Sequence, residues 1–188
     1  VSVPWDQLVV EPLTNDGRQF VRLSMPGWSV PQQSAEPQLP LVALALGVPF
    51  GVDLQVEVVP GATSSVALPS PVVPAPTLRA DWDLDALTQG RSLLPTPVTE
   101  LDPAGEIYGS GAAYPGVLAE IADDGIIRQQ RVAGIVVYPI QYRPGSKTAT
   151  IYHSLIVHIR FKADPSANGL ALGSQPESEA YEELFRTQ

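Results

Sequence analysis

The chain carries few side chains of the kinds that build a catalytic centre. It has two histidines and no cysteine, which excludes disulfides, thiolate metal sites and thiol nucleophiles. His153 and His158 lie in the run Thr148–Phe161, whose β-branched and apolar composition predicts one strand. Because side chains alternate along a strand, the two imidazoles are expected on opposite faces, where they could not share a metal or a substrate. His153 is better interpreted as a histidine at the margin of a core.

Other catalytic patterns are also missing from the sequence. A histidine-dependent serine hydrolase needs a positioned nucleophile, and no Gly-x-Ser-x-Gly turn occurs. Gly109, Gly111 and Gly116 form no phosphate-binding fingerprint, and no lysine follows them in a helix. The sequence therefore predicts a chain that is not an enzyme and uses no cofactor.

Three alternating carboxylates resemble the start of a calcium loop. They are Asp81, Asp83 and Asp85, but the sixth position of such a loop is Ala86 instead of glycine. The twelfth is Ser92, where a calcium loop has a glutamate that binds through both oxygens. An exposed acidic loop is the simpler interpretation, and we expect no bound metal.

The composition predicts a single domain of short strands. The chain has 188 residues, 44% apolar and 16% charged, with 20 prolines and 15 glycines spread without a period. This length and apolar content allow one sizeable core, and the prolines argue against long helices. A net charge of -9 makes nucleic acid an unsuitable partner. No apolar run is long enough to span a bilayer, so we expect no membrane segment.

Strand and turn signals alternate along most of the chain. Asn15-Asp16-Gly17 predicts a hairpin turn, and residues 53–59 alternate as a half-exposed strand does. A second turn is expected at Asp123-Asp124-Gly125. Without βαβ alternation, this pattern indicates an all-β fold, an antiparallel β-sandwich of jelly-roll type. The strands are expected over residues 5–13, 18–25, 41–46, 53–59, 64–68, 117–122, 126–132, 134–142 and 148–161.

Two segments depart from this pattern. Residues 69–113 are rich in Pro, Gly, Asp, Ser and Thr and are expected to form a long irregular loop; loops of that length are usually functional or disordered. Residues 164–188 are expected to be a loose linker that ends in a short helix, Glu177–Arg186. Tyr181, Leu184 and Phe185 give that helix one apolar face.

Several motifs together resemble the N-terminal prodomain of gingipain-type cysteine peptidases. The most specific is Tyr-Pro-Ile-Gln-Tyr, residues 138–142, and the resemblance is carried best by residues 36–161. Its pieces, in order, are Glu36–Leu41, Leu54–Val59, Tyr108-Gly109, Tyr114–Gly116, Ile127–Val132, Tyr138–Pro144, Thr148–Tyr152 and Tyr181–Arg186.

The resemblance implies that residues 1–188 are one exported prodomain. Such a domain precedes a Cys/His peptidase domain, helps it to fold, blocks its active site and is then cleaved off. The expected partner is therefore the catalytic domain of a cognate secreted cysteine peptidase, and we expect a monomer when the chain is isolated.

The resemblance also suggests roles for three arginines. The family's inhibitory loop falls within residues 69–113, where Arg79 follows a proline-stiffened run and is our first candidate for the residue that enters the peptidase. Arg91 is the alternative, and both could instead be solvated surface residues. An arginine would suit a peptidase that cuts after arginine, since a guanidinium pairs with a carboxylate through two hydrogen bonds. Arg186 is expected near the processing boundary, or to act only as a cation at the end of a helix.

A stand-alone adhesion or carbohydrate-binding β-sandwich is the alternative function. Trp5, Trp28 and Trp82 could stack on sugars, although tryptophans in sandwiches are more often core or interface residues.

Overall fold

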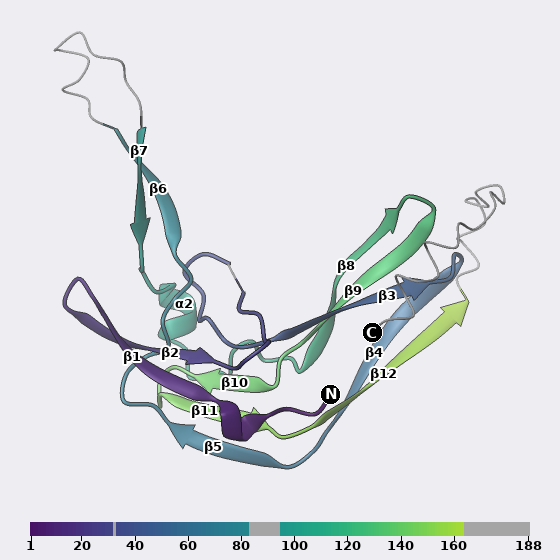
Figure 1. Ribbon diagram of the computed structural model, residues 1–188, viewed down its shortest axis with the longest axis horizontal. Coiled ribbons are helices and arrows are strands. Elements are labelled where there is room, and N and C mark those ends of the chain that lie inside the picture. The colour runs from purple at the N-terminus through teal and green to yellow at the C-terminus, as the bar shows by residue number, and fades with distance from the viewer. Residues whose placement is uncertain (32, 83–94, 164–188) are drawn as a thin grey trace, which may run out of the picture.

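The computed structural model describes residues 1–31, 33–82 and 95–163. It confirms an all-β fold built from antiparallel strand pairs, with a 3-10 helix at Trp5–Gln7 and the short helix α2 at Gly105–Tyr108 (Figure 1). The strands are β1 (Val9–Asn15), β2 (Arg18–Ser24), β3 (Val42–Val48), β4 (Val52–Pro60), β5 (Thr63–Ala67), β6 (Thr77–Trp82), β7 (Pro95–Glu100), β8 (Ala119–Ile127), β9 (Gln130–Val137), β10 (Ile140–Arg143), β11 (Thr148–Tyr152) and β12 (Leu155–Ala163).

In the part of the chain that the structure describes, the strands pair within five small sheets. The orders are β1-β2, β10-β11-β5, β12-β4, β3-β9-β8 and β6-β7. The expected turn at Asn15-Asp16-Gly17 is confirmed: Asn15 pairs with Arg18, and both Asp16 and Gly17 adopt positive φ, at 48° and 75°. That pair of angles is what a two-residue hairpin loop requires.

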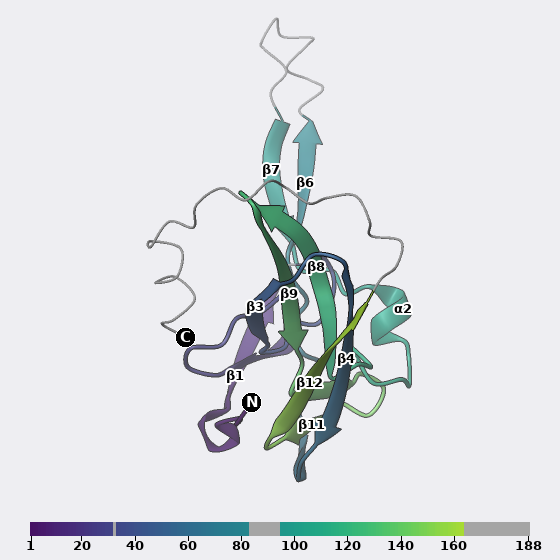
Figure 2. The same cartoon turned by 90° about the vertical axis from the view of Figure 1, so that its right-hand side faces the viewer.

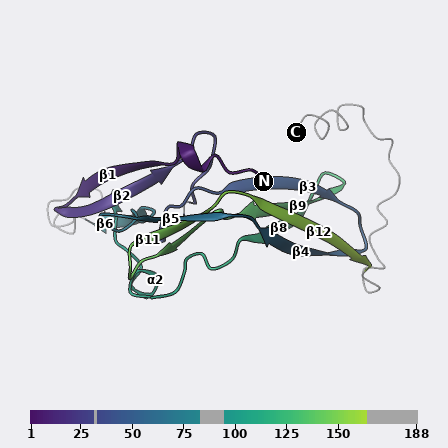
Figure 3. The same ribbon diagram turned by 90° about the horizontal axis from the view of Figure 1, so that it is seen from below.

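The apolar side chains form two cores at the two ends of the molecule. The first core packs β2 against β10 and β11, which lie in separate layers when the molecule is seen from below (Figure 3). Its buried members are Val3, Val21, Leu23, Met25, Leu39, Leu68, Val72, Ile140, Tyr142, Ala149 and Ile151. The second core lies between β9 and the β4–β12 pair, and its fully buried members among the described residues are Ile135, Val137 and Leu155.

The single strand expected over residues 148–161 is wrong. It is divided into β11 and β12, which belong to different sheets, with the break at His153-Ser154. The segment between β4 and β5, which pairs with this region, bends at the same place. The Gly61 amide donates to the Ser154 carbonyl oxygen over 2.9 Å, and the His153 amide donates to the Ala62 carbonyl oxygen over 2.8 Å. A Cβ on residue 61 would collide with the Ser154 hydroxyl, so this close approach requires glycine.

The turn expected at Asp123-Asp124-Gly125 is also wrong. These residues lie inside β8, and the chain turns instead at Arg128-Gln129, which interrupts the strand expected over 126–132. A β-bulge between Ile121 and Asp123 explains the difference, because it takes up one residue and lets the strand continue.

Candidate functional site

One hairpin projects from the body of the domain. Strands β6 and β7 pair from Thr77 opposite Glu100 to Trp82 opposite Pro95, and they extend away from the other sheets (Figures 1 and 2). The irregular loop expected over 69–113 is therefore wrong for these residues. The prolines of β7 had indicated an irregular loop. They are compatible with this strand because it lies at the edge of a two-stranded sheet, where a missing amide hydrogen need not break a ladder.

The leg that enters the hairpin is buried and tightly held. Val72, Val73 and Ala75 are at most 1% exposed. The Val73 amide donates to the Val21 carbonyl oxygen over 2.8 Å, and the Ala75 amide donates to the Glu36 carbonyl oxygen over 2.8 Å. This leg is therefore joined to neighbouring chain on both sides before β6 begins.

The leg that leaves the hairpin is held by α2. The Ala104 amide, just before α2, donates to the Ala35 carbonyl oxygen over 2.9 Å. At the end of the helix, the Tyr108 hydroxyl donates to the Val72 carbonyl oxygen over 2.7 Å, while the Val72 amide donates to the Tyr142 hydroxyl over 3.3 Å. Burial raises the pKa of both phenols, so both keep their protons: the Tyr108 hydroxyl donates to Val72, and the Tyr142 hydroxyl accepts from it. Both legs are thereby connected at Val72.

A second tyrosine pair braces the same region. The Tyr114 hydroxyl donates to the carboxylate of Glu36, and burial followed by this hydrogen bond raises the pKa of Tyr114. The Tyr138 hydroxyl donates to Glu120 over 2.7 Å, and burial with this bond raises the pKa of Tyr138 to about 12. Sequence reasoning missed this tyrosine network, although the resemblance already pointed to the segments that contain it.

The structure describes some of the residues that the sequence suggested for function, and others lie outside the described ranges. Arg79 lies in β6 opposite Val98, on the projecting hairpin. Arg91 and Arg186 lie outside the described residues. Of the expected acidic loop, Asp81 lies in β6 beside Trp82, and the remaining positions, from Asp83 to Ser92, also lie outside. The expected helix Glu177–Arg186 falls outside as well.

The two histidines, together with Trp5 and Trp28, make contacts within the domain. His153 stacks on Trp5 with ring centroids 4.6 Å apart, and its Nε2 lies 3.1 Å from the Ser64 hydroxyl. His158 lies in β12 opposite Glu57. Trp28 packs half-buried against the first core.

Metal and membrane signals can be tested over the part of the chain that the structure describes. Among those residues no group of three or more His, Asp or Glu side chains is placed to hold a metal ion. Within the same residues no helix has the length and apolar character needed to cross a membrane.

The fold is that of an all-β domain that presents a projecting hairpin anchored at both legs. The chain matches the family Propeptide_C25 over residues 1–175 and belongs to that family. The resemblance to gingipain prodomains is thereby confirmed, and the chain is a propeptide domain rather than a catalytic one.

Curated relatives and solved structures that resemble the chain are consistent with its membership of this family. Gingipain R2 of Porphyromonas gingivalis, from strains ATCC 33277 and W83, is 26% identical over 83 residues, which are 44% of this chain and 11% of the relative. The chain therefore spans only a small part of the curated relatives that it matches.

Two solved structures share the fold. One, described as a complex of Porphyromonas gingivalis RgpB pro- and mature domains, has a TM-score of 0.63 at 19% identity and covers 95% of this chain and 84% of that chain. The other, described as showing zymogenic latency of gingipain K from the same organism, has a TM-score of 0.57 at 17% identity and covers 82% and 81%.

Proposed function

We propose that this domain keeps a gingipain-like cysteine peptidase latent by inserting the β6–β7 hairpin into the active-site cleft of the catalytic domain that follows it. The observation that carries the proposal is the hairpin itself, a projecting element with both legs anchored in the body of a propeptide-family domain. Its partner is then the catalytic domain of the same exported precursor, and the domain also assists the folding of that catalytic domain.

The anchoring supports inhibition for an energetic reason. Ordering a loop when it binds costs conformational entropy, and an element that is already ordered avoids much of that cost. Here the Val72–Ala75 leg is buried and the other leg is tied to it through Tyr108. Leu78 in β6 is 74% exposed, an apolar side chain free to enter a partner's pocket. Arg79, on the next position of the same strand, would supply the cation.

The comparisons with solved structures also support the proposal that this domain keeps a peptidase latent. One neighbour in fold is described as a complex of pro- and mature domains, and another as a structure of zymogenic latency. Binding between this chain and its own catalytic domain is the corresponding expectation. Its net charge of -9 would favour docking on a basic surface.

Shortening the hairpin tests the proposal. Residues 78–99 would be replaced by Asn-Gly, so that Thr77 and Glu100, which already pair, are joined by a two-residue turn. We expect the shortened domain to keep its β-sheet circular dichroism and unfolding midpoint, and to lose inhibition of the purified catalytic domain by at least about a hundredfold. A shortened domain that folds normally and inhibits as well as the original would overturn the proposal.

Folding assistance needs a separate measurement. The denatured catalytic domain would be refolded alone, with the intact domain and with the shortened domain. We expect the intact propeptide domain to raise the yield of active catalytic domain, measured after the propeptide domain has been removed. An equal yield in all three reactions would contradict a role in folding and would leave inhibition to be judged by the hairpin experiment.

A further inference from the structure

The second core is incompletely covered along the β4–β12 pair. Cross-strand neighbours on one face of this pair are apolar along its whole length, from Val58 opposite Val157 to Leu54 opposite Phe161. Their exposure rises toward the end of β12: Leu155 is fully buried, Val157 is half-buried and Phe161 is 49% exposed. This face begins in a core and ends in solvent.

The opposite sheet is also open at this end. Arg131 donates to the carboxylate of Asp124 at 2.9 and 2.5 Å, and to the Val52 carbonyl oxygen over 2.6 Å, which ties β8 and β9 to the start of β4. Beyond this polar contact, Ile126 lies opposite Arg131 and is 48% exposed. Phe50, in the turn between β3 and β4, is also exposed.

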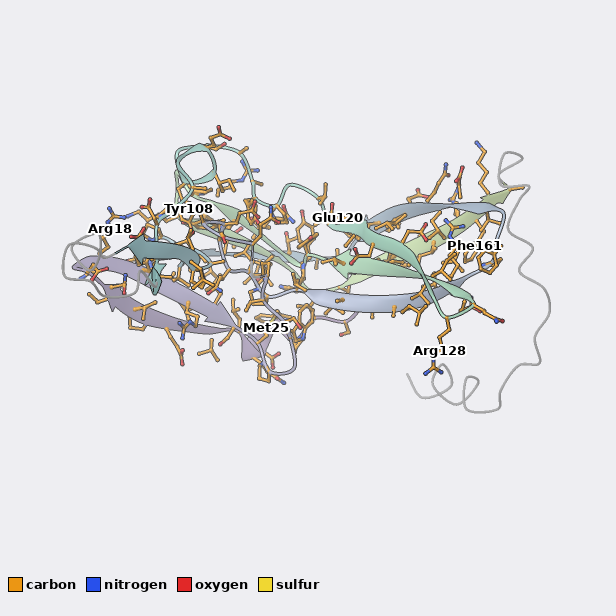
Figure 4. The ribbon with its side chains drawn as sticks, turned by 90° about the horizontal axis from the view of Figure 1, so that it is seen from above. Arg18, Met25, Tyr108, Glu120, Arg128 and Phe161 are labelled. Atoms are coloured by element: carbon orange, nitrogen blue, oxygen red, sulfur yellow. The ribbon has the colours of Figure 1, made fainter. Side chains whose placement is uncertain are left out.

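We call the apolar surface formed by Phe50, Ile126 and Phe161 the distal face. It lies at the end of the molecule farthest from Arg18, where Figure 4 labels Phe161 and Arg128. Figure 1 likewise separates the ends of β8 and β12 from the projecting β6–β7 hairpin. The distal face is therefore distinct from the surface that we assign to the peptidase.

We propose that the C-terminal segment, residues 164–188, folds back and covers the distal face. Tyr181, Leu184 and Phe185 in this segment are spaced three and four apart, so in a helix they would share one side. Together they form an apolar strip of aromatic and aliphatic side chains that matches the aromatic and aliphatic residues of the distal face.

The segment starts in the right place and is long enough. Ala163, the last described residue, lies opposite Val52 at the open end of β4–β12. The eighteen residues from there to Tyr181 span at most about 60 Å when extended, whereas a nine-residue strand such as β12 is only about 30 Å long. Pro165 and Asn168-Gly169 are residue types that reverse the chain direction.

Disulfide trapping tests this placement in the full chain, which has no cysteine of its own. The trapping variant carries Phe161→Cys and Leu184→Cys. The matched control carries Lys162→Cys and Leu184→Cys, which moves the cysteine by one position to the other face of the same strand. Under mild oxidation we expect the intramolecular disulfide to form about tenfold faster in the trapping variant, because docking raises the effective concentration of the two thiols.

The other outcomes of this experiment overturn the proposal. Equal rates in both variants would mean that the segment does not settle on the distal face. Disulfide-linked dimers, formed faster with Phe161→Cys, would assign the face to a second copy of the chain. A third variant, Leu184→Ser with Phe185→Ser, checks the result without cysteine: we expect faster amide exchange in β12 near Phe161 and unchanged exchange in β2, and unchanged exchange in both strands would contradict the proposal.

Discussion

Tyr108 donates a hydrogen bond to the main-chain oxygen of Val72, and this 2.7 Å contact joins the two legs of the projecting hairpin. The two residues are 36 positions apart in the chain, and the whole hairpin lies between them. Because Val72 is fully buried, its carbonyl oxygen has no ready access to water as a substitute partner.

Replacing Tyr108 by phenylalanine should therefore destabilise the domain and loosen the hairpin. Removing one partner of a buried hydrogen bond costs about 1–3 kcal/mol, which can be measured by denaturant unfolding. We also expect weaker inhibition of the peptidase. Tyr152→Phe is the control, because among the described residues the Tyr152 hydroxyl makes no hydrogen bond, and its loss should change the free energy of unfolding by less than about 0.5 kcal/mol. Equal effects of the two substitutions would contradict the role given to Tyr108.

Arg79→Ala should weaken inhibition if Arg79 enters the specificity pocket. Loss of a central buried anchor costs at least about 2 kcal/mol, or roughly thirtyfold in affinity. Arg91→Ala would be measured beside it, since Arg91 is the alternative in the same segment. Arg22→Ala, which removes an exposed cation from β2 in a different sheet, is the control. If neither Arg79→Ala nor Arg91→Ala changes the inhibition constant, an arginine anchor is wrong.

Acid should destabilise the domain partly through Asp124. The hydrogen bonds from Arg131 hold the pKa of this carboxyl below its ordinary value. Since the pKa in the folded state is lower than that in the unfolded state, the stabilisation is present above the ordinary pKa and is lost as the pH falls through the folded value. We expect Asp124→Asn to be less stable than the original chain at neutral pH, and the difference to shrink between about pH 5 and pH 2.

Asp123→Asn is the matched control for this pH dependence. Asp123 is the neighbouring carboxylate in β8, and within the described residues it makes no ion pair. Its substitution should leave the slope of stability against pH close to that of the original chain. A difference between Asp124→Asn and the original chain that stays constant down to low pH would contradict the role of the Arg131 pair.

Processing is expected near Arg186. Arg186 is the one cation within residues 177–188, and a peptidase that cuts after arginine would need such a residue at the boundary. In the longer precursor, Arg186→Ala should shift or abolish cleavage at this position, as read by N-terminal sequencing of the matured catalytic domain. Arg160→Ala, in β12 where Arg160 pairs with Glu57 over 2.8 Å, should leave the cleavage position unchanged. A mature N-terminus far from Arg186 in the original precursor would count against this site.

The sequence by itself determined the fold class and the family resemblance. Short-range signals carried these conclusions, because alternation in residues 53–59 and the turn residues Asn15-Asp16-Gly17 act over a few positions, and the chain obeys them locally. The missing cysteines and the scarce histidines limited the possible chemistry for the same reason, since composition needs no fold to be read.

Only the tertiary structure decided where the regular strands break and how the proposed inhibitory element is held. The break at His153-Ser154 depends on the close approach of Gly61, which is 93 positions away in the chain from Ser154. The strand β7 was not predicted from the sequence because it contains prolines. Prolines are acceptable in this strand because it lies at the edge of a sheet. The contact of Tyr108 with Val72 likewise joins residues that no local pattern relates. These features depend on which distant segments meet, and local propensity carries no information about that.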